Sequence, residues 1–97
     1  MKKLIYLTLL VFSTSSFSTA FDATKNERKT MKITWEVAAD VNKACAAEHA
    51  KHGSKLIYQV DACAVWQKNT CKIITKQKPT EEDVGHEIRH CFQGHFH

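Results

Sequence analysis

The sequence predicts a small single-domain α+β protein in which a helix, a β-hairpin and a C-terminal helix follow one another and are stapled by disulfides. Three observations support this fold class. Two stretches carry apolar residues at helical spacing between capping residues, and the stretch between them is rich in β-branched and aromatic residues. Four cysteines are distributed over all three stretches. No internal repeat or low-complexity tract is present, so one domain accounts for the pattern.

Residues 1–20 are predicted to be a secretory signal peptide. Two lysines give a positively charged start, residues 4–12 form an apolar core, and Ser18, Thr19 and Ala20 place small residues at the cleavage positions. The apolar run is shorter than the roughly 20 residues that a membrane-spanning helix needs. We therefore expect a periplasmic or extracellular protein without a membrane anchor, which begins at Phe21 and keeps 77 of the 97 residues.

Residues 21–33 are polar and show no apolar period, so we expect a flexible leader before the folded domain, residues 34–97. The domain should open with a helix from Trp35 to about His52. Thr34 can cap the start of this helix and Gly53 can end it. Its buried stripe is expected to consist of four apolar residues at helical spacing: Val37, Val41, Ala44 and Cys45.

The middle of the domain should be a β-hairpin. Residues 55–66 are expected to be extended because they include Ile57, Tyr58 and Val60, which favour strands. Residues 68–70 then form a turn, and residues 71–75 form a second short strand. This order places a two-stranded unit between two helices.

The last segment has the features of a helix that follows Thr80. Thr80 is a natural N-cap, Asp83 occupies the capping-box position, and the acidic residues after the cap suit the positive end of the helix dipole. His86 and His90 project from one side of this helix, nearly opposite the apolar stripe, so they should line a site and not the core. The stripe itself consists of Val84, Ile88, Cys91 and Phe92.

His86, Glu87 and His90 form the pattern H-E-x-x-H. Two histidines one helical turn apart can bind one Zn²⁺ through their imidazoles, and the glutamate beside them can take a proton from water. The pattern alone is short, but the capped helix with separate core and ligand faces supports it. We therefore predict a C-terminal metal-site helix with Glu87 as the catalytic residue.

These residues resemble the motif of the zincin metallopeptidases, and the longer segment is similar to the metzincin pattern H-E-x-x-H-x-x-G-x-x-H. This chain has one extra residue before Gly94, and His97 follows three residues after that glycine. The resemblance covers residues 85–97 and assigns no particular peptidase family. It implies a zincin-like α+β domain with bound Zn²⁺ and peptide-hydrolysing activity.

Two histidines make an incomplete zinc shell, so a third ligand is required. His97 is the first candidate because Gly94 lets the chain leave the helix and turn back toward the metal, and His95 is the alternative. Three polar residues near the end of the first helix are expected to be solvated there: Glu48, His49 and His52.

An exported chain of this size usually needs staples, and its four cysteines can form two disulfides. The strand 71–75 and the helix 81–91 each advance roughly 15 Å in opposite directions, which favours Cys71 with Cys91 and Cys45 with Cys63. The alternative pairs Cys63 with Cys71 and Cys45 with Cys91. The absence of a C-x-x-C pair argues against cysteines as metal ligands.

The sequence therefore predicts an exported, zinc-dependent, metallopeptidase-like protein that acts on a peptide or protein substrate. Two alternatives remain open: a non-catalytic secreted metal-binding protein, and a disulfide-stapled structural or interaction domain. Loss of Lys2 and Lys3 with the signal peptide lowers the formal net charge from +4 to +2. No basic stripe is interleaved with aromatic residues, so we expect no nucleic-acid partner.

Overall fold

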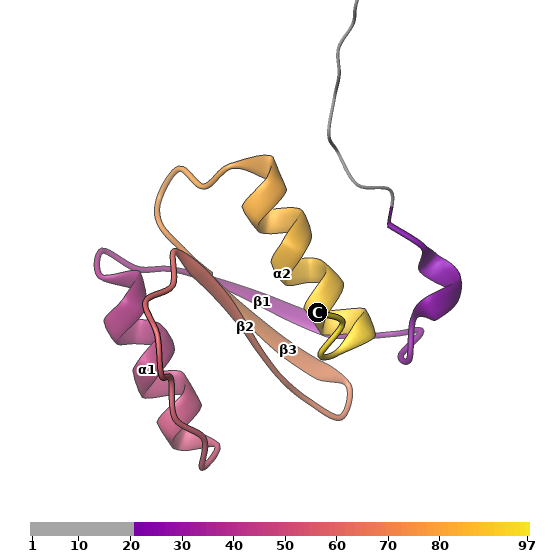
Figure 1. The fold of residues 1–97 in the computed structure, drawn as a ribbon, viewed down its shortest axis with the longest axis horizontal. Coiled ribbons are helices and arrows are strands. Elements are labelled where there is room, and N and C mark those ends of the chain that lie inside the picture. Colours follow the sequence, from indigo (N-terminus) through magenta and orange to yellow (C-terminus); the bar gives the residue numbers. More distant parts are fainter. Residues whose placement is uncertain (1–20) are drawn as a thin grey trace, which may run out of the picture.

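The structure, a computed structural model, describes residues 21–97, and the predicted signal peptide lies outside the described residues. The described chain is a small α+β domain with two helices and a mixed sheet, which confirms the predicted fold class (Figure 1). Its elements in order are η1 (Ala23–Lys25), β1 (Lys32–Val37), α1 (Val41–Lys51), β2 (Ala62–Gln67), β3 (Thr70–Thr75) and α2 (Glu81–Gln93).

The sheet has three strands in the order β1-β3-β2. β2 and β3 form the expected antiparallel hairpin, in which Trp66 lies opposite Cys71. Lys68 at its turn has a positive φ of 46°. β1 pairs with the other edge of β3 in parallel, with Ile33 opposite Cys71. β1 and β2 are therefore the edge strands among the described residues.

The two helices cover opposite faces of this sheet, so the domain has three layers (Figure 1). On one face, α1 packs against Cys63 and Ile74 through Val41 and Cys45. On the other face, Cys91 of α2 packs with three strand residues: Ala64, Cys71 and Ile73. The period of two in β3 produces this division, because neighbouring residues of a strand point to opposite faces. The central strand β3 therefore contributes residues to the hydrophobic clusters on both faces of the sheet.

One disulfide staples each face of the sheet. Cys45 of α1 is bonded to Cys63 of β2, with their Cα atoms 6.2 Å apart, and Cys71 of β3 is bonded to Cys91 of α2 across 5.6 Å. This is the pairing that the segment lengths favoured. Two disulfides are typical of a protein that resides in an oxidising, extracytoplasmic compartment.

The first helix is shorter than the sequence suggested, because residues 35–37, where it was expected to start, belong to β1. The sequence places residues 32–37 at the end of the leader and the start of the helix, but they pair with β3 over their whole length. α1 begins only after Asp40, whose side chain accepts a hydrogen bond from the Lys43 backbone N–H at 3.0 Å. Pairing with β3 satisfies the backbone groups of residues 32–37 that point toward β3. This gain outweighs the helix propensity of the alanines that follow, so the helix does not extend back through these residues.

The first strand of the hairpin is also shorter than predicted. Residues 55–61 form a loop, and the strand begins only at Ala62. Ile57 and Tyr58 are exposed, while the backbone N–H of Val60 donates to the Asn42 side chain at 3.0 Å. Although this loop contains residues that favour strands, none of the described residues forms a strand beside it. The Asn42 side chain of α1 accepts the Val60 N–H in place of a strand partner.

The segment expected to be a flexible leader makes specific contacts with the end of α2. The backbone N–H groups of Glu27 and Arg28 both donate to the Phe92 carbonyl, at 2.9 and 3.2 Å. The side-chain amide of Gln93 donates to the Asp22 carbonyl at 2.7 Å and to Asn26 at 2.9 Å. The C-terminal carbonyls of α2, which the helix itself leaves unpaired, are satisfied in part by this segment. Within residues 21–97, no helix is long and apolar enough to cross a membrane.

Candidate metal centre

The C-terminal helix presents two histidines one turn apart, as its sequence predicted. α2 begins at Glu81 after Thr80, whose hydroxyl accepts a hydrogen bond from the Asp83 backbone N–H at 3.0 Å. Cys91 and the partly buried Ile88 and Phe92 pack on the sheet. His86 therefore lies at an exposed surface, and His90 lies at the buried margin of the same site.

A sharp turn at Gly94 returns the chain to these two histidines. Gly94 ends α2 with φ 65° and ψ −132°, a backbone conformation that other residues rarely adopt. Its N–H donates to the His90 carbonyl at 2.8 Å, and its own carbonyl accepts from the Phe96 N–H at 3.0 Å. These two bonds fold the last residues back along the helix and deliver the His97 imidazole to the site.

The three imidazoles of His86, His90 and His97 converge through their Nε2 atoms. The Nε2 atom of His97 lies 3.0 Å from that of His90 and 3.2 Å from that of His86. Zn–N bonds of about 2.0–2.1 Å in tetrahedral geometry separate two nitrogen ligands by roughly 3.3 Å. The observed separations are thus close to those that one zinc ion requires, and the three residues form a group that could hold a metal ion.

Hydrogen bonds alone do not satisfy this arrangement. The Nδ1 atom of His90 lies 2.7 Å from the Gly94 carbonyl, which only accepts, so Nδ1 carries the hydrogen and Nε2 of the neutral ring carries a lone pair. The Nε2 atom of His97 holds one hydrogen at most, yet it faces two nitrogens. At most one of the two contacts of the His97 Nε2 atom can therefore be a well-formed hydrogen bond. A cation at the centre, in contrast, would be attracted by the lone pairs of all three nitrogens.

Burial favours the neutral, metal-binding form of two of these rings. Desolvation lowers the pKa of His90 to about 4, with a smaller opposing contribution from its hydrogen bond to Gly94. The pKa of His86 is also lowered, first by burial and then by the charge of His97. Both effects reduce competition from protons for the nitrogen lone pairs.

Aromatic rings support the group from two sides. The indole of Trp66 on β2 stacks on the His90 ring, with centroids 5.5 Å apart and 12° between the planes. The Phe96 ring packs against both histidines of α2, with its centroid 4.4 Å from that of His90 and 5.1 Å from that of His86. The guanidinium of Arg89 lies 4.1 Å from the Phe96 ring centre and helps to hold it. The sequence did not indicate the roles of Trp66 and Phe96, because neither stands at a recognisable spacing from the motif.

His95, the alternative third ligand, is not part of the group. Its ring packs against Trp66, with centroids 4.9 Å apart, while the three metal-binding candidates are His86, His90 and His97. The extra residue before Gly94 thus does not prevent the third histidine from reaching the other two.

Glu87, the expected catalytic residue, directly follows His86 in α2 and is only 8% exposed. Burial, and secondly the charge of Asp83, raise the pKa of Glu87 to about 7. Among residues 21–97, no side chain or backbone N–H donates a hydrogen bond to its carboxyl group. The carboxyl oxygens therefore remain available for a proton or a water molecule.

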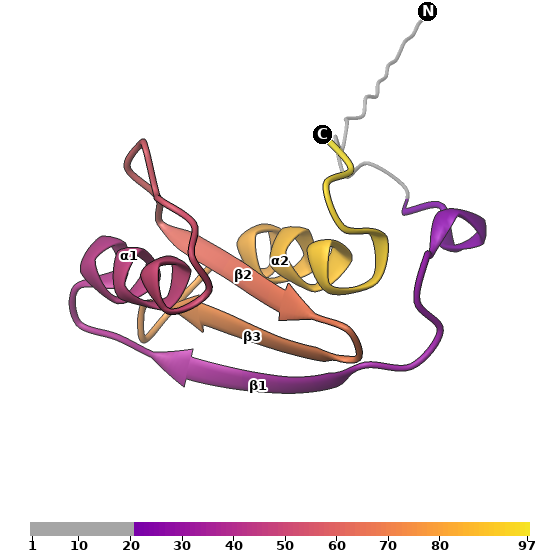
Figure 2. The same cartoon turned by 90° about the horizontal axis from the view of Figure 1, so that it is seen from below.

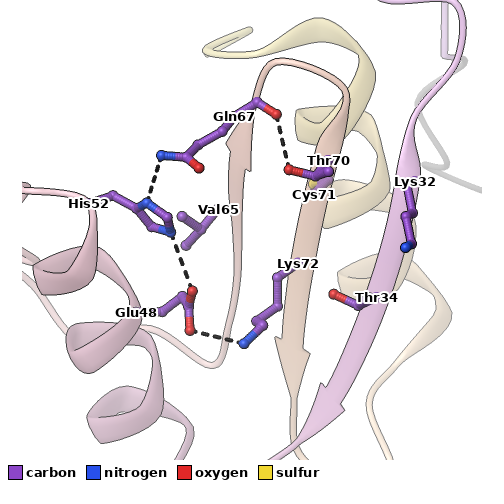
Figure 3. Close-up of a pocket in the computed structure, with 9 residues that line it drawn as sticks. All are labelled: Lys32, Thr34, Glu48, His52, Val65, Gln67, Thr70, Cys71 and Lys72. Atoms are coloured by element: carbon purple, nitrogen blue, oxygen red, sulfur yellow. Dashed lines mark hydrogen bonds and ion pairs between the residues drawn. The ribbon is translucent and has the colours of Figure 1, made fainter.

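Glu48 and His52 of the first helix end line a hollow of about 260 Å³ on the opposite face of the sheet (Figure 3). Glu48 is buried there, so the expectation that it is solvated was wrong. Burial would raise the pKa of Glu48, but a hydrogen bond and charge from Lys72, together with the charge of Lys51, outweigh burial and lower it. His52 lies 3.4 Å from the Glu48 carboxylate and accepts from the Gln67 amide at 2.7 Å. These residues hold α1 on the sheet and do not contribute to the histidine group.

The fold and the site together define a small, disulfide-bonded α+β domain with a three-histidine group that could hold a metal ion. Comparisons with protein-family models, curated protein sequences and solved structures find no match for this chain.

Proposed function

We propose that the protein is exported and is a zinc-dependent peptidase of the zincin type. In this proposal His86, His90 and His97 hold the metal, and Glu87 acts as the general base. The observation that carries the proposal is the convergence of three imidazole Nε2 atoms, one of them from the residue that precedes the buried Glu87. Two disulfides and the predicted signal peptide, residues 1–20, support export.

The chemistry of the donor set fits zinc. Three neutral imidazoles supplied by two helical residues and one downstream residue are a known ligand pattern of catalytic zinc, which keeps a fourth position for water or substrate. Zinc in such a site acts as a Lewis acid that acidifies water and polarises a carbonyl group. His86 and His97 are exposed, so the open side of the group faces solvent. The hydrogen bond from His90 to Gly94 fixes the ring orientation.

Glu87 would supply the proton transfer. A carboxylate whose pKa lies at about 7 can accept a proton near neutral pH and release it again in the same turnover. It would take this proton from the attacking water and deliver it to the leaving amine of the cleaved peptide bond. Since no N–H or O–H group among the described residues engages its carboxyl group, Glu87 is free to make these transfers.

The outer edge of β2 is the best candidate for binding substrate. Among the described residues no strand pairs with this edge, and Trp66 on the same strand stacks on His90. An extended peptide that adds to β2 through backbone hydrogen bonds would therefore run beside the histidine group. This mode favours an unfolded or extended segment of a peptide or protein as substrate.

The test combines metal analysis with a cleavage assay. Oxidised protein purified after export should contain one zinc per chain and should cleave members of a peptide library, with activity lost on addition of a chelator. Glu87→Gln should abolish cleavage while zinc remains bound, since the amide cannot take a proton. His86→Ala combined with His90→Ala should remove both zinc and activity. Retained cleavage in Glu87→Gln would contradict the assigned general base.

A second function uses the same ligands without turnover. Two of the three histidines are exposed, so the group lies at the surface of the domain, an arrangement that also suits a secreted protein that only binds metal. Zinc binding without cleavage, and with no effect of Glu87→Gln, would support this function. Failure to take up zinc at micromolar concentration would leave a disulfide-stapled structural or interaction domain.

A further inference from the structure

Within residues 21–97, β1 exposes an apolar stripe, and no strand pairs with its outer backbone edge. Ile33, Trp35 and Val37 share the face on which α2 packs, yet they are 37%, 53% and 57% exposed because α2 covers β2 and β3 instead. Figure 2 shows β1 at the margin of the sheet, with neither helix beyond it. The Trp35 indole is fixed by a hydrogen bond from its Nε1 to the Thr75 hydroxyl at 2.8 Å. An ordered aromatic ring on an open edge loses little freedom when it is covered.

The backbone groups at the outer edge belong to the same three residues. The N–H groups of Lys32 and Ala38 donate inward, to Asn69 and Thr75 of the neighbouring chain segment. Because inward and outward backbone groups alternate along a strand, those of Ile33, Trp35 and Val37 point away from β3. β1 has neither a bulge nor a proline that would block pairing at this edge.

The charges of β1 are self-complementary about Thr34. In an antiparallel pair of two β1 strands with Thr34 opposite Thr34, Lys32 of each strand lies directly opposite Glu36 of the other. The same register places Ile33 opposite Trp35, so that the outward backbone groups meet as hydrogen-bonded pairs. A shift of two residues to either side replaces these two opposite-charge pairs with neutral ones. Charge therefore selects one register.

The ion pairs and the exposure of Lys32 and Glu36 within one chain support this pairing. Among residues 21–97 Lys32 has no ion-pair partner, and its side chain lies on the face of the sheet toward α1 (Figure 3). Glu36 is held on that same face by Lys72, 3.4 Å away, and remains 46% exposed at its side chain. One charge is thus unpartnered and the other is oriented and accessible.

We propose that β1 pairs with β1 of a second copy of this chain, antiparallel and with Thr34 opposite Thr34, to give one six-stranded sheet. The occupant of the open edge is a second copy because its charges match those of β1 in both halves of the strand. This dimer lies on β1, at the opposite edge of the sheet from β2. It stands independently of the metal site.

Charge reversal tests the proposal. Sedimentation velocity of the oxidised, exported protein should show a dimer at protein concentrations up to about 1 mM, the range in which weak dimers with small interfaces form. The dimer should dissociate on dilution. Lys32→Glu and Glu36→Lys should each weaken the dimer at least about tenfold, because like charges then lie opposite each other twice.

A mixture of the two variants provides the rescue. In an equimolar mixture the protein should dimerise again, since one chain then carries acidic groups at both positions 32 and 36 and the other carries basic groups at both. Lys55→Glu, on the exposed loop before β2, is the control for net charge and should change nothing.

A crosslink tests the register separately. Thr34→Cys should form an intermolecular disulfide, because non-hydrogen-bonded antiparallel neighbours have Cα atoms about 4.5 Å apart. Lys32→Cys should not, since position 32 faces position 36 of the partner. A wild-type protein that stays monomeric up to about 1 mM, or a mixture of the charge variants that does not associate, would overturn the proposal.

Discussion

The Nε2 atom of His97 lies 3.0 Å from the Nε2 atom of His90, although the two residues belong to a turn and a helix and are seven positions apart. This contact completes the three-histidine group, and it leads to a direct test of the ligand set. His97→Ala should weaken zinc binding by more than the roughly 10- to 100-fold that loss of a supporting contact costs. Competition with a chelator of known affinity measures the change.

His95→Ala is the matched control for that experiment. His95 is also a histidine of the same turn, but its ring packs on Trp66 and lies outside the group. Its removal should leave zinc affinity unchanged. An equal loss of affinity in the two variants would mean that the ligand set is wrong.

The turn at Gly94 should be essential for delivering His97. Gly94 has a positive φ, and a Cβ atom there would lie 3.3 Å from Oε1 of Glu27. Gly94→Ala should therefore destabilise the fold by about 1–3 kcal/mol and weaken zinc binding as well. Thermal unfolding and chelator competition measure the two effects.

Gly85→Ala gives the opposite outcome and controls for the added methyl group. Gly85 lies inside α2, and a Cβ atom there would meet nothing within 4 Å. Alanine should stabilise the helix by about 0.5–1 kcal/mol with no loss of zinc affinity. A destabilised Gly85→Ala protein would show that the helix is constrained in a way that its contacts do not indicate.

The two disulfides should differ in their effect on the metal site. Replacing Cys71 and Cys91 by Ala removes the covalent tie between β3 and α2 and should cost about 2–4 kcal/mol of unfolding free energy. It should also weaken zinc binding, because α2 carries the ligands. Replacing Cys45 and Cys63 by Ala should cost a similar amount while the folded protein keeps its zinc affinity, since that bridge lies on the other face of the sheet. Denaturant unfolding and chelator competition on both double variants measure the difference.

The stability of the metal-free protein should depend on pH through Glu87. Burial raises the pKa of Glu87 from 4.5 to about 7, so the folded state takes up this proton at higher pH than the unfolded state does. The contribution of the protonated acid to stability is present below pH 4.5 and is lost as the pH rises through 7. Glu87→Gln should therefore be more stable than the wild type by up to about 3 kcal/mol at pH 8, a difference that disappears at acidic pH.

His90 makes the free energy of unfolding depend on pH in the opposite direction, in the wild type and in Glu87→Gln alike. Its pKa is lowered to about 4 from 6.5, so its neutral form stabilises the fold above pH 6.5 and that contribution is lost as the pH falls toward 4. The comparison of wild type with Glu87→Gln by denaturant unfolding at each pH cancels this shared term. A stability difference independent of pH would show that Glu87 is not protonated in the fold.

Part of the structure followed from local signals. Thr80 and the acids after it start α2, and the spacing of His86 and His90 places both on one helix face whatever the rest of the chain does. The hairpin of β2 and β3 follows from β-branched residues on either side of a polar turn. The expected start of the first helix at Trp35 was wrong, because pairing with β3, far along the chain, outweighed local helix propensity.

The sequence by itself thus determined the fold class, the second helix and two of the three histidines. Only the tertiary structure decided that His97 and not His95 joins them, since that choice depends on the backbone angles of Gly94 and on Trp66 of another strand. The tertiary structure also decided that β1 is an edge strand among the described residues. The neighbours of a strand are set by contacts between distant segments, and these contacts produce no periodic pattern in the sequence of the strand itself. Local periodicity determines which face of an element a residue occupies, and packing determines what that face meets.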